Sequence, residues 1–236
     1  MTKKIAIMQP YFFPYIGYFQ LINAVDEFVI YDNIEFTKKG WINRNRILVN
    51  GVDSFITLPL KKDSDFLHVK DRFLADTWDK DRKKMLNRIT ESYRKAPFYK
   101  EVFQMFELCI MYDDRNLFNF IINAIQSTMN YLEIKTKLVV SSSVNIDQQL
   151  RSEDKVIAIC KTMNASTYIN PIGGLELYDK ERFRGNNLEL QFQKANNIIY
   201  TQFNNEFVPW LSIIDVMMFN SKKEITSCLN NYSIVL

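Results

Sequence analysis

Short apolar runs separated by polar breaks mark the beginning of the chain. Residues 3–8 (KKIAIM) form a β-prone run that ends at Gln9-Pro10. Apolar residues then follow a helical spacing over positions 16–25, and residues 27–31 (EFVIY) form a second β-prone run. A strand, a helix and a strand within about 30 residues predict a βαβ unit, with parallel pairing and a right-handed crossover.

A hairpin signal follows. Two β-prone segments, 46–49 and 54–58, flank Asn50-Gly51. Asn-Gly is a strong signal for a tight hairpin because both residues accept the positive φ angles that the turn needs. We expect this hairpin at a sheet edge, where it offers a surface for pairing in a homodimer, although nothing in the sequence requires one.

Helical and β-prone patterns alternate over the rest of the chain. The helical segments are 78–93, which ends before Ala96-Pro97, then 117–132 and 152–160, and two short helices from about Pro209 and from Ser221. The β-prone segments are 137–140, 166–169 and 188–192. This alternation predicts one α/β domain over 1–236, built on a Rossmann-like parallel sheet, with a helical insertion at about 78–132 and helices at the C-terminus.

Composition and charge narrow the class of protein. The chain has 236 residues, 47% hydrophobic and 24% charged, which excludes a disordered chain. No apolar run approaches the ~18 residues that a membrane span needs. The apolar stretch within the first ten residues is too short for a signal peptide. A net charge of +3 without a dense basic block gives no sign of nucleic-acid binding. We expect a cytoplasmic globular protein.

Cysteine and histidine usage limits the chemistry. The three cysteines lie far apart in apolar surroundings, which is typical of buried free thiols rather than of a disulfide frame or a zinc site. The chain has one histidine, His68. Metal sites built on several histidines are therefore excluded, and we expect no metal site.

Polar residues, glycines and cations follow each predicted strand of the parallel sheet. Ligands of open parallel sheets bind beyond the carboxyl ends of the strands. The residues are Gln9, Tyr11, Tyr15 and Tyr18, then Asp32, Lys38, Lys39, Trp41, Asn43, Arg44 and Asn45, then Ser141–Ser143, and finally Asn170, Gly173 and Gly174. Amides, hydroxyls and cations of this kind fit a phosphorylated, hydroxyl-rich ligand.

Two roles in this set need charge. Arg44, with Lys39 and Lys38, is a candidate clamp for a diphosphate, the alternative being an ordinary surface loop. Asp32 is a candidate base, the alternative being a carboxylate that caps a loop. His68 is the other candidate base because imidazole titrates near neutral pH, the alternative being a surface histidine.

The neutral residues of the set are candidates for binding the substrate. Tyr11, Tyr15, Tyr18 and Trp41 offer rings that stack on a sugar or a base, unless they simply pack the first helix. The amides are candidates for reading hydroxyl groups; they are Gln9, Asn43, Asn45 and Asn170. Gly173-Gly174 either cradles the substrate or turns the chain after a strand.

One segment resembles a known family. Residues 9–22 (QPYFFPYIGYFQLI) are very similar to the opening of the WbqC-like family. The likeness covers almost the whole chain, continuing through Tyr31-Asp32, 39–45, 168–170, 173–174, 177–178 and 211–215. The resemblance implies a component of surface-polysaccharide clusters, such as those for O-antigen and lipopolysaccharide, and transfer of glycine or another acyl group to an amino sugar.

A second resemblance concerns the fold. Tyr15-Ile16-Gly17-Tyr18 lies where nucleotidylyltransferases have His-x-Gly-His, between the first strand and the next helix. The resemblance implies a nucleotidylyltransferase-like fold. In those enzymes the histidines stabilise the α-phosphate, so the two tyrosines here speak against transfer of a nucleotidyl group.

We therefore expect a transferase that N-acylates a nucleotide-linked amino sugar. The acyl donor and any cofactor stay unknown, because the chain has no coenzyme A or folate signature. Two alternatives are open: a non-catalytic protein that binds nucleotide sugars or scaffolds other glycan enzymes, and a nucleotidyltransferase.

Overall fold

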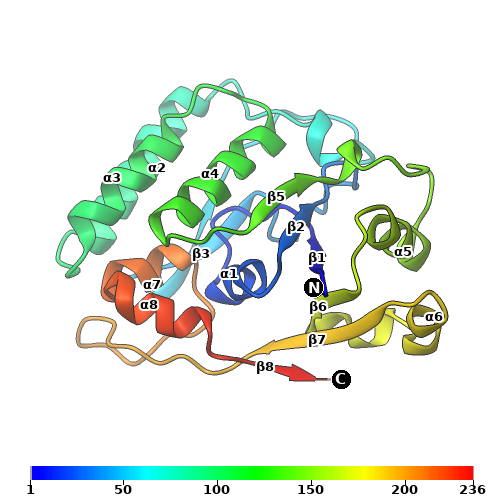
Figure 1. Cartoon of the computed structure of the whole chain (residues 1–236). Coiled ribbons are helices and arrows are strands. Elements are labelled where there is room, and N and C mark those ends of the chain that lie inside the picture. Colours follow the sequence, from blue (N-terminus) through cyan, green and yellow to red (C-terminus); the bar gives the residue numbers. More distant parts are fainter. Residues whose placement is uncertain (1, 236) are drawn as a thin grey trace.

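A computed structural model describes residues 2–235 (Figure 1). Six strands form one mixed sheet in the order β5-β2-β1-β6-β7-β8. Their bounds are β1 Lys4–Met8, β2 Glu27–Ile30, β5 Lys137–Val140, β6 Thr167–Pro171, β7 Glu189–Ala195 and β8 Tyr232–Val235. The first five strands in this order are parallel, and β8 runs antiparallel to β7. The expectation of an α/β fold with a mostly parallel sheet is confirmed.

Alternation along the central strands buries both faces of the sheet. In β2, Phe28 and Ile30 belong to one apolar core, and Val29 belongs to the other. Neighbouring side chains of a strand point to opposite faces, so an unbroken apolar run fits a strand that is covered on both sides. The parallel register of β1 and β2, from Ile5–Glu27 to Met8–Ile30, confirms the predicted βαβ unit.

Helices cover both faces. The first core holds side chains from α1 (Ile16–Asn23), α7 (Ile213–Phe219) and α8 (Lys222–Leu229). The second core holds side chains from α5 (Ser152–Thr162) and α6 (Lys180–Gly185). Figure 1 shows these two groups of helices on opposite sides of β1.

The predicted hairpin is present, but it stands apart from the main sheet. Strands β3 (Arg44–Val49) and β4 (Val52–Thr57) form a separate two-stranded sheet. Both turn residues have positive φ, 51° at Asn50 and 81° at Gly51, as a tight hairpin requires. The expectation of a hairpin at the edge of the main sheet was therefore wrong, and pairing in a homodimer stays a prediction.

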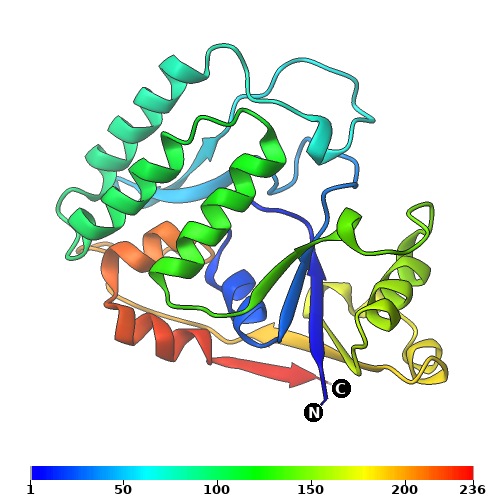
Figure 2. The same ribbon diagram turned by 45° about the horizontal axis from the view of Figure 1, so that its top comes forward.

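Three long helices lie between this hairpin and β5 in the chain. They are α2 (Trp78–Tyr93), α3 (Tyr99–Ile110) and α4 (Leu117–Tyr131), and they share the first core with α1. Figure 2 shows the β3–β4 hairpin (light blue) beside these helices. Three short 3₁₀ turns complete the structure: η1 Val69–Asp71, η2 Ser141–Ser143 and η3 Ile172–Leu177.

Some elements differ from the expectation. Helix α7 begins at Ile213 rather than near Pro209, because the Ser212 hydroxyl caps it by accepting a hydrogen bond from the Ile214 amide at 3.2 Å. The end of the described chain forms β8, not a helix, because residues 232–235 pair with β7. The sequence reading also missed α3 and α6.

Candidate functional site

The carboxyl edge of the sheet opens between β1 and β6. These strands pair only at Lys4–Thr167 and Ile5–Tyr168, whereas β1 and β2 pair as far as Met8–Ile30. The chain leaves β1 toward α1 on one face and leaves β6 toward α6 on the other. A sheet whose connections diverge in this way has its ligand crevice at this point.

Two cavities that share a wall lie at this edge, beside the start of α1. The larger, of about 280 Å³, is lined by α1, the end of β7 and the segment 195–211. The smaller, of about 190 Å³, is lined by Tyr11, Pro14, Trp41, Asn45 and Arg46 together with the shared residues Tyr15 and Trp210. We call them the paired cavities.

Tyr15 and Trp210 form the wall between the paired cavities. Their ring centroids are 5.9 Å apart, and Trp210 is 54% exposed with a φ of 60°. The Tyr15 ring lies over the first turn of α1, because a Cβ placed on Gly17 would be 2.3 Å from it. Glycine at position 17 therefore permits the close approach of the ring.

Arg46 is a residue of the site that the sequence reading missed. Its guanidinium donates to the Trp210 carbonyl at 3.2 Å, pairs with Asp53 at 3.1 Å and lies 5.8 Å from the centre of the Trp41 ring. Its Nε is buried without a hydrogen-bond partner among the residues described. Arg44 and Arg46 alternate along β3 and so share a face, and this spacing could have revealed Arg46.

The predicted diphosphate clamp is partly engaged within its own loop. Arg44 donates to the carbonyls of Gly40 at 3.1 Å and Lys39 at 2.7 Å, and it packs over the Phe55 ring at 4.7 Å. Lys38 pairs with an exposed carboxylate at 2.7 Å. Lys39 is exposed and lies two positions before Trp41 in the same loop. Arg44 thus shapes the loop that carries Lys39 and Trp41.

Three predicted substrate-binding side chains are turned into the protein. The Tyr18 hydroxyl donates to the Gln9 carbonyl at 2.9 Å, and its ring is buried. The Asn43 amide donates to a backbone carbonyl at 2.9 Å. The Asn45 amide donates to the carbonyls of residues 12 and 13 at 3.1 and 3.0 Å. The bonds of Tyr18 and Asn45 fix the turn that carries Tyr11 and Tyr15, and Asn45 also lines the smaller cavity. The bond of Asn43 goes to Leu58 and ties the start of β3 to the end of β4.

Asp32 lies two strands away from β6, at the end of β2. Its buried carboxylate accepts hydrogen bonds from the Ser141 hydroxyl at 2.7 Å and the Ser142 amide at 3.0 Å. Burial alone would raise the pKa of this carboxyl, but the bonds from Ser142 and Ser141 outweigh burial and lower it. Lys70 lies 4.0 Å from its other oxygen. Asp32 is therefore a fixed negative charge.

The structure brings His68 to the same region of the chain. The Lys70 amide donates to the Asp32 carbonyl at 3.1 Å, and His68 forms a β-bridge with Glu35. The imidazole Nδ1 is 3.9 Å from the Asp71 carboxylate, and the residue is half-buried. The two predicted bases thus lie on neighbouring segments.

The loop after β6 is built by a close approach. Asn170 is buried, accepts a hydrogen bond from the Tyr168 hydroxyl at 3.0 Å and donates to the Pro171 carbonyl at 3.0 Å. A Cβ on Gly174 would lie 2.0 Å from the Asn170 amide nitrogen, whereas Gly173 is exposed with open space around it. Close packing against Asn170 therefore requires glycine at position 174. Gly173 is the glycine of the pair that a ligand can approach.

Other reactive groups are poorly placed for catalysis. Burial raises the pKa of Cys109 to about 11 and that of Cys160 to about 12, so neither thiol forms a thiolate readily. Within residues 2–235, no group of three or more His, Cys, Asp or Glu side chains could hold a metal ion. No helix in the same range is long and apolar enough to cross a membrane.

The fold is a mixed α/β fold with a mostly parallel sheet, and two adjoining aromatic-walled cavities lie beside the start of α1. The chain belongs to the WbqC-like protein family, whose model matches residues 9–227. It is 28% identical over 223 residues to an uncharacterized protein of Mycobacterium tuberculosis, Rv1507c, covering 92% of this chain and 94% of that protein. No solved structure matches significantly. The resemblance to the WbqC-like family is confirmed, whereas the nucleotidylyltransferase-like fold stays a prediction.

Proposed function

We propose that this protein is a transferase of surface-glycan assembly that binds a nucleotide-linked amino sugar in the paired cavities and acylates its amino group. A glycyl group is the acyl group that the family resemblance implies. The observation that carries the proposal is the pair of adjoining cavities that share Tyr15 and Trp210 at the carboxyl edge. Cavities of a few hundred Å³ with aromatic walls and few polar groups are typical of small-molecule sites.

The chemistry of the walls supports a ligand with two flat or apolar faces joined by negative charge. Exposed Trp210 and Trp41 offer rings for a base or for the CH face of a sugar. Arg46 contacts both tryptophans, through the Trp210 carbonyl and the Trp41 ring, and its guanidinium brings positive charge to this wall for a diphosphate. Lys39, on the neighbouring loop, adds a mobile positive charge.

The strand order supports a Rossmann-like sheet. The parallel strands run in the order β5-β2-β1-β6-β7, which in chain order is 3-2-1-4-5, the order of doubly wound nucleotide-binding sheets. The start of α1 carries Tyr15 and Tyr18 in place of imidazoles, and the Tyr18 hydroxyl is bonded to the Gln9 carbonyl. This supports nucleotide binding without nucleotidyl transfer.

The acyl transfer assigns separate roles to the two candidate bases. They line neither cavity and lie beyond the end of β2, so the proposal requires the amino group of the bound sugar to reach that place. The amine nitrogen of the sugar attacks the carbonyl carbon of an activated ester or thioester, a C–N bond forms, and the bond to the leaving group breaks with its electron pair. We assign the removal of the amine proton to His68, which lies on the segment beside Asp32. Asp32 has a lowered pKa and stays ionised, so its role is to orient the ammonium form before the proton leaves.

A thermal-shift titration tests the binding step. A diphosphate-linked amino sugar at 100 times its Kd would stabilise the protein by ~2.7 kcal/mol, a rise in Tm of about 5–10 °C for a chain of this size. We expect Trp210→Ala and Arg46→Ala to abolish the shift. Phe66→Ala is the matched control, because Phe66 is 78% exposed and lines neither cavity. No shift with any nucleotide-linked sugar would overturn the proposal.

Product analysis then separates the enzyme from the alternatives. Mass spectrometry of the sugar after incubation with activated glycyl donors should show the N-acylated product, and His68→Ala should lower kcat more than it changes KM. Binding without any acylated product would favour a non-catalytic binding protein. A shift with ATP–magnesium alone would favour nucleotidyl transfer.

A further inference from the structure

Lys155, in the first turn of α5, is a buried cation without a paired anion. The residue is 6% exposed, and its ammonium makes one hydrogen bond among residues 2–235, to the Asn33 side-chain oxygen at 3.2 Å. It also lies 5.7 Å from the centre of the Tyr31 ring. A lysine ammonium carries three N–H donors, so two remain for another partner.

The carboxylates around Lys155 are already engaged elsewhere. Glu153, in the same turn of α5, pairs with Arg182 at 2.9 Å, and Asp154 pairs with the same guanidinium. One oxygen of Asp32 accepts bonds from the η2 turn, and the other faces Lys70 at 4.0 Å. None of these carboxylates forms an ion pair with Lys155.

Two further cations influence the ammonium group of Lys155. Burial, then the positive charge of Arg151 and of Lys70, lower the pKa of Lys155, and the charge of Asp32 offsets this only in part. Lys70 lies 4.0 Å from the Asp32 carboxylate, and Lys155 donates to the neighbouring Asn33 at 3.2 Å, both at the carboxyl ends of β2 and β5. Buried charges in proteins are normally paired, because leaving water without a partner is costly. Lys155 is buried with only a neutral hydrogen-bond partner, so an anion at this place would complete its bonding.

We infer that Lys155, Lys70 and Arg151 form a binding site for an oxyanion, a phosphate or a carboxylate group, at the carboxyl ends of β2 and β5. Lys155 forms the floor of this site, whereas Arg151 is exposed and Lys70 is half-buried, so the ligand enters between them. None of the three residues lines the paired cavities, which adjoin β1 and β7. The inference goes beyond the proposed function: it concerns a second site beside Asp32, and it holds whether or not the paired cavities bind a sugar nucleotide.

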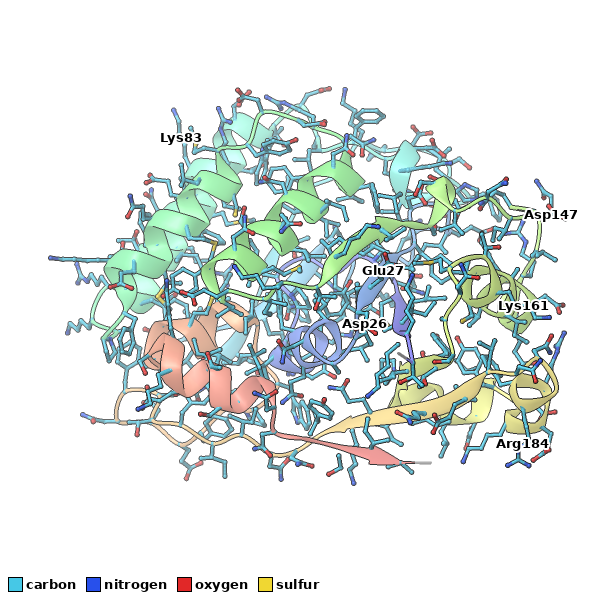
Figure 3. The ribbon with its side chains drawn as sticks, in the orientation of Figure 1. Asp26, Glu27, Lys83, Asp147, Lys161 and Arg184 are labelled. Atoms are coloured by element: carbon cyan, nitrogen blue, oxygen red, sulfur yellow. The ribbon has the colours of Figure 1, made fainter. Side chains whose placement is uncertain are left out.

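Titration with inorganic phosphate tests the site, with sodium chloride of the same ionic strength as the reference. We expect phosphate to raise the Tm of the wild type, and Lys155→Met to weaken the apparent affinity at least tenfold. Methionine preserves the packing volume and removes the charge, so this variant should be as stable as the wild type without phosphate. Lys161→Met is the matched control, since Lys161 is exposed on the same helix (Figure 3).

Two results of this titration would contradict the inference. A phosphate response that Lys155→Met leaves intact, or no response beyond that of chloride, would overturn the inference. Lys70→Met, at a half-buried surface position, should weaken the response by a smaller factor and serves if the first variant fails to fold. A parallel titration with acetate distinguishes a carboxylate ligand from a phosphate ligand. A response to acetate as strong as that to phosphate identifies a carboxylate ligand. Trp210→Ala should leave the phosphate response unchanged.

Discussion

Replacing Asp215 tests how the wall of the larger cavity is held in place. Asp215 is fully buried and accepts three hydrogen bonds from neutral side chains: Tyr93 at 2.8 Å, Tyr200 at 2.6 Å and Gln202 at 2.7 Å. The side-chain oxygen of Gln202 in turn accepts a hydrogen bond from the Val208 amide at 2.7 Å, and its nitrogen donates to the Val208 carbonyl at 3.1 Å. The carboxylate therefore ties the segment that lines the cavity to α7 and, through Tyr93, to α2.

The expected cost of Asp215→Ala follows from the donors that it leaves behind. Tyr93 and Gln202 are buried, and each unsatisfied donor costs roughly 1–3 kcal/mol, whereas half-buried Tyr200 can turn to water. The substitution also removes the cost of burying a carboxylate, so the loss of stability should lie below the upper end of this range. We expect a loss of about 3 kcal/mol and a fall in Tm of about 6–12 °C.

The pH dependence has a definite sign. Burial raises the pKa of Asp215 above its ordinary value, although the bonds from Tyr200, Tyr93 and Gln202 oppose this. The folded protein then binds the proton more tightly than the unfolded chain does, so the stability that this group contributes is fully present below its unfolded pKa, about 3.9. It is lost as the pH rises through the folded value. The advantage of the wild type over Asp215→Asn should therefore be larger near pH 4 than near pH 7.

Urea unfolding of a double-mutant cycle is the assay. Tyr200→Phe removes one bond to the carboxylate and should cost roughly 1.5 kcal/mol. Because Tyr200 and Asp215 contact each other directly, the cost in the double variant should fall short of the sum by at least about 0.5 kcal/mol. Strict additivity, or an Asp215→Ala variant with the Tm of the wild type, would refute this account of the cavity wall.

Three further predictions concern other parts of the crevice. Gly17→Ala should displace the Tyr15 ring and weaken binding in the paired cavities, as titration of the variant with the sugar nucleotide will show. Ser141→Ala should raise the lowered pKa of Asp32; its cost of about 1.5–3 kcal/mol at neutral pH should shrink as the pH falls through that pKa, in unfolding experiments at several pH values. Cys228, half-buried, should react with iodoacetamide in the native protein before the two buried thiols, which peptide mapping can follow.

The parts of the fold that were predictable have local causes. The βαβ unit at residues 3–31 follows from apolar runs on either side of a helical spacing, and the hairpin follows from Asn50-Gly51. Helix α6 has only six residues and β8 only four, too few for a period to stand out. Strand β8 exists because β7 offers it an edge, and a local pattern does not contain that information.

The residues of the candidate site also fall into those that the local sequence predicts and those that it does not. Tyr11, Tyr15 and Trp41 were predictable because they follow predicted strands at the edge where ligands bind, and they do line the smaller cavity. Trp210 lies in a segment without regular structure, and nothing local marks it. Lys155 is separated from its partner Asn33 by 122 positions, so its unusual environment arises only when α5 packs beside the end of β2.

Asp32 shows why the residue type alone does not fix the role. A carboxylate at the end of a strand is a reasonable candidate base in sequence, but a base must bind a proton at working pH. Here two donors from the η2 turn hold the carboxylate ionised, and in return it ties that turn to the end of β2. The paired cavities and the Lys155 site open on the same edge of the sheet, on either side of β1, and Asp32 stands on the Lys155 side. A fixed charge there suits the orientation of a substrate better than the removal of a proton.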